Sequence, residues 1–174
     1  MNKARKELWN CDDELDILKE VVIPVGLEAR LYKCRILYGE GIRKVEFLPY
    51  RLPAIRSLKL IYNDEISYHY KYENREAINA LYACKDTCDD ILIVKNGLLT
   101  DTSYCNIVLS DGVNYHTPAN PLLHGTKRQQ LLQEQKITEA CISVDQLKFY
   151  HTIYLINAML ELEDNVCLST DQVY

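Results

Sequence analysis

Asp101 begins the segment Asp101-Thr-Ser-Tyr-Cys-Asn106, which contains several side chains that could take part in chemistry. The residues before it, 91–100, are mostly apolar around an Asn-Gly turn, which predicts that Asp101 ends a strand entering the core. An aspartate in a turn usually caps the local backbone. A buried carboxylate instead needs a cationic or protonated partner, so Asp101 is a candidate for a chemical role.

Lys71 lies upstream, in the aromatic segment Tyr68-His-Tyr-Lys-Tyr72 and just before a predicted helix. Taken alone, a lysine at such a place is more often solvated, because lysine is rarely buried. In a partly apolar, aromatic site its pKa can fall, and the neutral amine can then form a Schiff base. The residues themselves leave both interpretations of Lys71 open.

The segment Gly125-Thr126-Lys127-Arg128 predicts the start of a helix. A glycine before a helix leaves backbone N–H groups at the positive end of the helix dipole, which suits a phosphate group. The plainer interpretation is an ordinary first turn with Thr126 near the cap. Lys127 and Arg128 either add positive charge to this site or lie in solvent.

The composition indicates an ordinary globular protein of 174 residues, with 48% hydrophobic and 26% charged residues. The net charge of −5 and the lack of a basic run argue against a general nucleic-acid binder and against binding to an anionic membrane. Seven cysteines without a Cys-x-x-Cys pair argue against a zinc ribbon, and four scattered histidines suggest no metal site. No membrane span or signal peptide is predicted, and scattered thiols fit a reducing compartment, so we expect a cytoplasmic protein.

Antiparallel hairpins alternating with single helices favour the α+β class. Asn96-Gly97 and Asp111-Gly112 each predict a two-residue hairpin turn of type I′. Helical spacing predicts a helix over residues 73–84 and a second one from Gly125 to about residue 135. Other strands are expected over residues 31–38, 43–50, 57–62, 140–144 and 152–156, with a helical turn over residues 145–149.

Together, these motifs resemble the class IV (fold type IV, D-amino-acid-aminotransferase-like) pyridoxal phosphate enzymes over about residues 65–165. Lys71-Tyr-Glu-Asn-Arg75 resembles the Schiff-base lysine followed by the Asn-Arg typical of the lyases in this family. Gly97 to Asn106 resembles the segment Gly-x-x-x-Glu-x-x-x-x-Asn, and His116-Thr-Pro118 resembles the family's Thr-Pro. Leu123 to Arg128 resembles the Leu-x-Gly-Ile-Thr-Arg helix start, and Asn157-Ala-Met159 resembles the Asn-Ala-Leu of the lyases.

The resemblance implies pyridoxal 5′-phosphate as the cofactor, in which the protein supplies orientation and electrostatics. Lys71 would hold the cofactor as a Schiff base and then serve as the acid and base. Asp101 would pair with the protonated pyridine nitrogen.

Other residues would hold the remainder of the cofactor, again by resemblance. The backbone of Gly125-Thr126-Lys127 would bind the phosphate. Ser103 and Asn106 would shape the loop beneath the ring, and Asn157 would lie near the phosphate or the substrate. We expect a partial N-terminal lobe over residues 1–62 and a larger, barrel-like cofactor-binding domain over residues 63–174.

The chain departs from the family pattern at three places. Asp101 stands where the family usually has Glu, so its shorter side chain must lie closer to the ring, and Lys127 stands where the family has Thr. The family's phosphate-binding Arg, in a His-x-x-Arg-Leu helix, would fall just before Met1. We therefore expect a truncated chain with an incomplete small lobe, a substitution by Arg5 or Lys3, or a decayed site.

The resemblance implies a lyase that converts 4-amino-4-deoxychorismate into 4-aminobenzoate and pyruvate in folate biosynthesis. The lyase-type motifs at Asn74-Arg75 and Asn157-Ala158 favour this activity over the alternatives. One alternative is a branched-chain or D-amino-acid aminotransferase of the same fold, and another is a non-catalytic or truncated family member. The family's pockets imply a homodimer acting on a small molecule.

Overall fold

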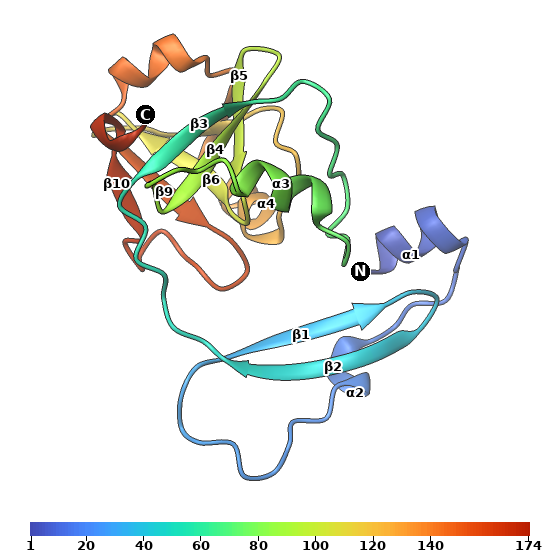
Figure 1. Cartoon of the computed structure of the whole chain (residues 1–174). Coiled ribbons are helices and arrows are strands. Elements are labelled where there is room, and N and C mark those ends of the chain that lie inside the picture. The colour runs from blue at the N-terminus through green and yellow to red at the C-terminus, as the bar shows by residue number, and fades with distance from the viewer. The chain divides into compact units, whose positions relative to one another are not determined.

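The computed structural model describes residues 1–174, which divide into two compact units, Met1–Arg51 and Leu52–Tyr174 (Figure 1). The boundary expected from the sequence lay after residue 62. The two boundaries differ because β3 (Leu58–Tyr62) pairs in parallel with β4 (Asp90–Lys95) and so belongs to the C-terminal unit. A parallel pair is joined by a crossover connection, which the local sequence pattern does not reveal.

The N-terminal unit contains two short helices and one antiparallel hairpin. The hairpin pairs β1 (Tyr32–Tyr38) with β2 (Ile42–Pro49) around the turn Gly39-Glu40-Gly41, as the sequence predicted. The helices are α1 (Asn2–Trp9) and α2 (Ile17–Glu20). α1 ends at Asn10, whose φ of 56° places it in the left-handed region, where asparagine is tolerated.

Arg5 is the buried cation of this unit and connects α1 to two other segments. Its Nε donates to the Glu40 carbonyl over 2.8 Å, and its Nη1 donates to the Asp13 carbonyl over 2.6 Å. Nη2 forms an ion pair with the Asp13 carboxylate at 2.9 Å, and this contact holds the pKa of Asp13 below its usual value. Every nitrogen of the Arg5 guanidinium therefore has a partner inside the N-terminal unit.

The C-terminal unit contains an eight-stranded sheet with the strand order β10-β9-β6-β5-β4-β3, in which β7 also pairs with β6 and β8 pairs with β7. The strands after β4 are β5 (Leu98–Thr102), β6 (Asn106–Ser110), β7 (Tyr115–Pro118), β8 (Thr138–Ala140), β9 (Thr152–Ile156) and β10 (Cys167–Ser169). The helices are α3 (Glu76–Tyr82) and α4 (Thr126–Gln133), with the 3₁₀ turns η1 (Val144–Phe149) and η2 (Thr170–Gln172). The predicted α+β class is confirmed.

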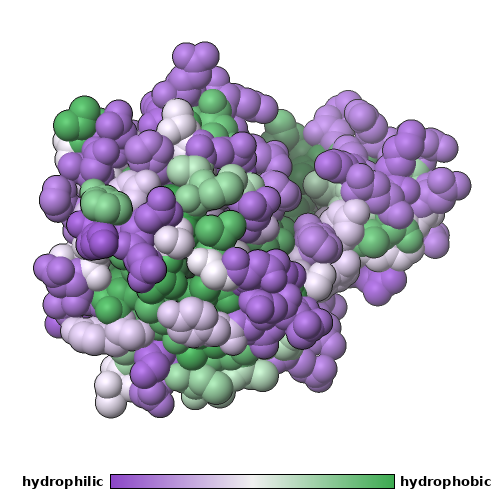
Figure 2. All heavy atoms as spheres, turned by 90° about the horizontal axis from the view of Figure 1, so that it is seen from above, coloured by the Kyte–Doolittle hydropathy of each residue, from purple (hydrophilic) through white to green (hydrophobic).

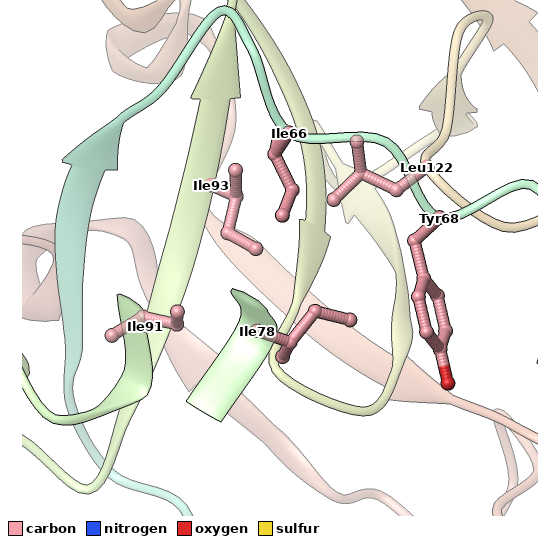
Figure 3. Packing of buried hydrophobic residues seen from close by; sticks show 6 residues of the cluster. All are labelled: Ile66, Tyr68, Ile78, Ile91, Ile93 and Leu122. Carbon is pink, nitrogen blue, oxygen red and sulfur yellow. The ribbon is translucent and has the colours of Figure 1, made fainter. Parts of the chain in front are cut away.

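One hydrophobic cluster holds α3 and the loops against β4 (Figure 3). Its members are all buried and come from the β3–α3 connection, α3, β4 and the segment before α4: Ile66, Tyr68, Ile78, Ile91, Ile93 and Leu122. Burying a side chain of this size stabilises a fold by roughly 1.5–3 kcal/mol. The cluster thus fixes both the connection that carries Lys71 and the loop that leads into α4.

Of the two hairpin turns that were predicted to be of type I′, one is confirmed and the other is wrong. Asn96 and Gly97 both have positive φ, 51° and 75°, and Lys95 pairs with Leu98, so the predicted type I′ turn is confirmed. The second turn was predicted to be of the same kind, which is wrong, because Ser110 pairs with Tyr115 and the loop between them has four residues. The Asp111 carboxylate accepts the Val113 and Asn114 N–H groups over 2.8 and 2.7 Å and so stabilises this longer loop.

The strand predicted over residues 140–144 lies earlier, as β8, and β10 was not predicted at all. β8 pairs in parallel with β7, and Ser143 forms only an isolated bridge with Leu98 before η1 begins. β8 and β10 each have three residues, and segments this short carry little periodicity.

Hydrophilic side chains cover much of the face seen in Figure 2, with hydrophobic groups between them. Such a mixture is usual, because apolar atoms contribute much of any protein surface. Among the helices, we find none whose length and apolar character would allow it to cross a membrane.

Candidate functional site

The tight turn between β5 and β6 organises the candidate site. The Thr102 N–H donates to the Cys105 carbonyl over 2.9 Å, which closes a loop made of Ser103 and Tyr104. The Thr102 hydroxyl accepts the Cys105 N–H over 3.1 Å. Thr102, Ser103 and Cys105 are all buried, so this turn lies inside the protein.

Asp101 stands directly before this turn with a buried carboxyl, as the sequence analysis expected. One oxygen accepts the Asn106 side-chain N–H over 2.8 Å, and the other accepts the Leu123 backbone N–H over 2.9 Å. Burial raises the pKa of Asp101 to about 6, although these hydrogen bonds and the charge of Arg128 act to lower it. A cation beside the carboxyl would lower this pKa, so the carboxyl would then be fully ionised.

Asn106 connects the sheet to the start of α4. Its side-chain amide nitrogen donates two hydrogen bonds, one to the Asp101 carboxylate and one to the Leu123 carbonyl, each over 2.8 Å. A Cβ atom on Gly125 would lie 2.1 Å from Asn106 Oδ1, which is far inside van der Waals contact. Glycine at position 125 is thus required for the backbone to approach Asn106 this closely.

α4 begins at Gly125 without a side-chain cap. The first-turn N–H groups, which include those of Thr126 and Lys127, have no intrahelical acceptor, and the helix dipole makes this end positive. The Lys127 ammonium forms an ion pair with Glu161 at 2.8 Å and donates to Gln130 over 2.9 Å. Lys127 therefore offers its backbone N–H at this helix start, while its side chain already has an anionic partner.

The sequence left open whether Arg128 adds positive charge to this site or lies in solvent, and its burial excludes the second alternative. Its guanidinium is buried, donates to the Pro118 carbonyl over 2.8 Å and forms an ion pair with Glu139 at 2.6 Å. These contacts join α4 to β7 and β8. Arg128 thus holds the helix start in place and also supplies positive charge near Asp101.

Lys71 lies on the connection between β3 and α3, with an exposed side chain. Its positive charge acts to lower the pKa of the Cys105 thiol, against the larger effect of burial. Four residues later, Arg75 donates through Nη2 to the Ser103 carbonyl of the same turn. The Lys71 segment and the turn are therefore physically linked, which sequence spacing alone did not reveal.

Asn157 directly follows β9 and contacts the β5–β6 turn from that strand. Its side-chain N–H donates to Cys105 Sγ over 3.1 Å, while its side-chain oxygen Oδ1 accepts the Met159 backbone N–H over 2.7 Å. Burial raises the pKa of Cys105 to about 12, so this thiol is neutral at physiological pH. Cys105 is thus a buried, neutral thiol and not an activated nucleophile.

The β5–β6 hairpin thus brings together residues that are far apart in the sequence. Asp101 and Asn106 lie between the sheet and the α4 start, while Lys71 and Asn157 both act on Cys105 at the turn. The structure also places Arg75, Asp90 and Arg128 around this hairpin. Arg75 and Arg128 both belong to motifs of the family resemblance, whereas Asp90 was visible only as an acidic residue next to a predicted strand, which is too common to single it out.

Comparisons with known proteins identify the family of the chain. A family profile described as "Amino-transferase class IV" matches residues 71–162. A protein from Haemophilus influenzae strain Rd, named "Uncharacterized protein", is 37% identical over 139 residues, which cover 80% of this chain and 74% of that protein.

Two crystal structures share the fold. One, of a "putative 4-amino-4-deoxychorismate lyase" from Haemophilus somnus 129PT, is 30% identical and has a TM-score of 0.81, covering 91% of this chain and 84% of that chain. The other, of a "putative amino-acid aminotransferase" from Mesorhizobium loti, is 22% identical with a TM-score of 0.62, covering 74% and 69% of the two chains. At that identity, the second comparison supports the fold alone. Because the profile matches more than half of the chain, from Lys71 past Asn157, the protein belongs to the class IV aminotransferase family of enzymes.

Proposed function

We propose that this enzyme is a pyridoxal-phosphate-dependent 4-amino-4-deoxychorismate lyase, which releases 4-aminobenzoate and pyruvate. The observation that carries the proposal is the β5–β6 hairpin, in which a buried carboxyl bonds to the loop before an uncapped helix start and whose turn is bonded to Arg75, four residues after Lys71. The lyase activity itself is supported by the similarity to the Haemophilus somnus protein over 91% of the chain. It is also supported by the motifs Asn74-Arg75 and Asn157-Ala158.

The residues present fit the cofactor on three counts. The pKa of Asp101, raised to about 6, suits a partner that carries positive charge, as a protonated ring nitrogen does. The first turn of α4 offers backbone N–H groups to a phosphate, and Gly125 keeps that turn free of a Cβ atom. Lys71 supplies a primary amine, the only side-chain group type that forms a Schiff base with an aldehyde.

When bound, pyridoxal phosphate supplies an electron sink for a carbanion formed next to nitrogen. The work left to the chain is orientation and proton transfer. Asp101 would hold the ring nitrogen in its charged form, and the backbone at Thr126 and Lys127 would bind the phosphate. Lys71 Nζ would accept the proton that leaves the substrate carbon, and Asn157 would lie beside the phosphate or the substrate.

The lyase and the aminotransferases of this fold differ in what they consume. Elimination of the enolpyruvyl group makes the product ring aromatic, so no amino acceptor is needed. An aminotransferase requires a keto acid as its second substrate. We further propose that the enzyme works on its small-molecule substrate as a cytoplasmic homodimer, whose mass light scattering can measure.

A lyase assay tests the proposal. Purified enzyme with pyridoxal phosphate is incubated with 4-amino-4-deoxychorismate, and pyruvate and 4-aminobenzoate are quantified without any keto acid. We expect equal amounts of both products, and neither from the Lys71→Ala variant. Product formation that depends on an added keto acid would instead identify an aminotransferase, and the absence of both reactions would refute the proposal.

A further inference from the structure

Cys105 is a buried polar group that the proposed reaction does not use. It belongs to the β5–β6 turn, where its carbonyl accepts the Thr102 N–H over 2.9 Å and its N–H donates to the Thr102 hydroxyl over 3.1 Å. The next residue, Asn106, carries the amide that bonds to the Asp101 carboxylate. Cys105 therefore joins the closed turn to the pair formed by Asp101 and Asn106.

The register of the sheet brings Asn157 opposite Cys105. β6 and β9 are antiparallel, and their ladder ends on this side at the pair Asn106–Ile156. In an antiparallel ladder the next two residues, Cys105 and Asn157, face each other. The backbone ladder does not continue, because the Asn157 N–H donates to the Leu160 carbonyl over 3.2 Å. A side-chain hydrogen bond takes its place, in which Asn157 Nδ2 donates to Cys105 Sγ over 3.1 Å.

The Asn157 side chain is itself held in one orientation. Its Oδ1 accepts the Met159 N–H over 2.7 Å, which closes a local turn of the kind that asparagine favours. The Leu160 N–H donates to the Asn157 carbonyl over 3.1 Å, and the Leu160 side chain is fully buried. The amide therefore presents its N–H to Cys105 from a fixed direction.

A second contact connects the same loop to α4. Glu161 forms an ion pair at 2.8 Å with Lys127, in the first turn of that helix. The Glu161 side chain is 60% exposed, and an ion pair of this kind contributes little. The contact with Cys105 is made at a buried thiol, where water does not replace a lost partner. We therefore place the main link between the loop and the site at Cys105.

We propose that Cys105 and Asn157 are a positioning pair, whose hydrogen bond holds the β5–β6 turn, and with it Asp101, in place for the cofactor. This inference rests on the proposed function, in which Asp101 meets the ring of pyridoxal phosphate. A neutral thiol suits the role, because its sulfur accepts a hydrogen bond without adding a negative charge to the turn. Neither residue reacts: Cys105 acts through the turn, and Asn157 acts through Cys105.

The first test uses the cofactor-free protein. Hydrogen–deuterium exchange with peptide mass spectrometry follows the backbone N–H groups of residues 101–106, two of which bond inside the turn. We expect exchange about threefold to tenfold faster in Asn157→Ala and in Cys105→Ala, because a neutral hydrogen bond is lost. Cys105→Ser keeps an acceptor and should stay within about twofold of wild type. Wild-type exchange in both alanine variants would overturn the inference.

Cys88→Ala is the matched control for the void that the smaller side chain leaves. Cys88 is also a buried thiol of the C-terminal unit, but it lies outside the β5–β6 turn. Exchange over residues 101–106 should therefore stay within about twofold of wild type. If Cys105→Ala does not fold, exchange in Asn157→Ala and in Cys105→Ser still decides the question.

A double-mutant cycle on cofactor affinity separates positioning from direct contact. Titration with pyridoxal phosphate should show binding about threefold to tenfold weaker for Asn157→Ala and for Cys105→Ala. Because Asn157 acts through Cys105, the variant with both changes should bind no more than about twofold more weakly than the weaker single variant. Effects that multiply in the double variant would mean that Asn157 contacts the cofactor directly, and they would overturn the inference.

The inference and the proposed function can fail separately. Wild-type protein that binds pyridoxal phosphate but releases no pyruvate would refute the lyase, and the cycle would still decide the role of the pair. In an active enzyme at saturating cofactor, Asn157→Ala should keep KM within about threefold of wild type, because its amide bonds to Cys105 and not to the substrate. A larger rise in KM would overturn the positioning role and leave the lyase in place.

Discussion

The Asp101 carboxylate accepts a hydrogen bond from the Asn106 side chain over 2.8 Å, across the narrow end of the β5–β6 hairpin. The same Asn106 amide donates to the Leu123 carbonyl, also over 2.8 Å. This pair therefore connects the sheet to the loop that leads into α4. Any ligand held by both Asp101 and the helix start depends on this connection.

Removing the charge of Asp101 should weaken cofactor binding. A hydrogen bond to a charged group contributes roughly 1.5–3 kcal/mol, so Asp101→Asn should bind pyridoxal phosphate about tenfold to a hundredfold more weakly. Fluorescence or absorbance titration with the cofactor measures this change. Asp12→Asn, at an exposed position, is the control and should bind as the wild type does. Equal affinities for Asp101→Asn and wild type would contradict the role of Asp101.

The raised pKa of Asp101 should make the cofactor-free protein less stable as the pH rises. Its folded-state pKa of about 6 lies above the ordinary value of 3.8, so the folded state binds more protons between these two values. The contribution of Asp101 is thus fully present below about pH 4 and is lost as the pH rises through about 6. The loss is on the order of 3 kcal/mol, and Asp101→Asn should lack it. Urea unfolding from pH 4 to pH 7 compares the two proteins, and parallel profiles would contradict the prediction.

A methyl group at position 125 should disrupt the helix start. Gly125→Ala would place a Cβ atom 2.1 Å from Asn106 Oδ1, and we expect it to lower the free energy of unfolding by about 1–3 kcal/mol. Gly41→Ala is a matched control, because a Cβ atom there meets nothing within 4 Å. Urea denaturation measures both variants. Equal stabilities for the two variants would show that the backbone at Gly125 can move away from Asn106.

Arg128 should contribute more to stability than any exposed ion pair. Arg128→Met removes a buried cation that bonds to Pro118 and Glu139, and loss of a hydrogen bond to a charged group typically costs about 1.5–3 kcal/mol. Lys136→Met breaks an exposed pair with Glu134, for which we expect a much smaller loss of stability. Thermal or urea unfolding of the two variants gives the comparison. A stable Arg128→Met protein would mean that the guanidinium does not hold α4 to the sheet.

The cysteines should differ in their reactivity toward alkylating reagents. Cys34, Cys84 and Cys141 are exposed, whereas Cys105 is buried with a pKa raised to about 12. Because only the thiolate reacts, Cys105 should remain unmodified near neutral pH while the exposed thiols are labelled. Peptide mass spectrometry after iodoacetamide treatment reads out each site. Rapid labelling of Cys105 in folded protein would contradict its buried placement.

Local sequence patterns were enough to predict most of the helices and strands and the first residue of each motif. The Asn96-Gly97 turn was predictable because its dihedral angles need these residue types, and the apolar strands around it identified Asp101 as a strand end. The β3–β4 pair was not predictable, since a parallel partner is chosen by the crossover and not by local sequence. β8 and β10 are too short to have a detectable period.

The candidate site could be predicted only in part for the same reason. The spacing of Lys71, Asp101 and Gly125 follows motifs that can be read along the chain. The contacts of Arg128 with Glu139, and of Arg75 with Ser103, depend on side chains that meet only after the sheet has formed. The fully buried state of Asp90 beside the half-buried Asp89 likewise follows from the direction in which β4 enters the core.

The central claim is that Lys71 is the residue that reacts with pyridoxal phosphate. The most direct test mixes purified protein with the cofactor, reduces the mixture with borohydride and maps the modified lysine by peptide mass spectrometry. We predict one stable pyridoxyl group on Lys71, together with a near-ultraviolet to visible absorbance band that Lys71→Ala lacks. Modification of a different lysine, or no modification at saturating cofactor, would contradict the account.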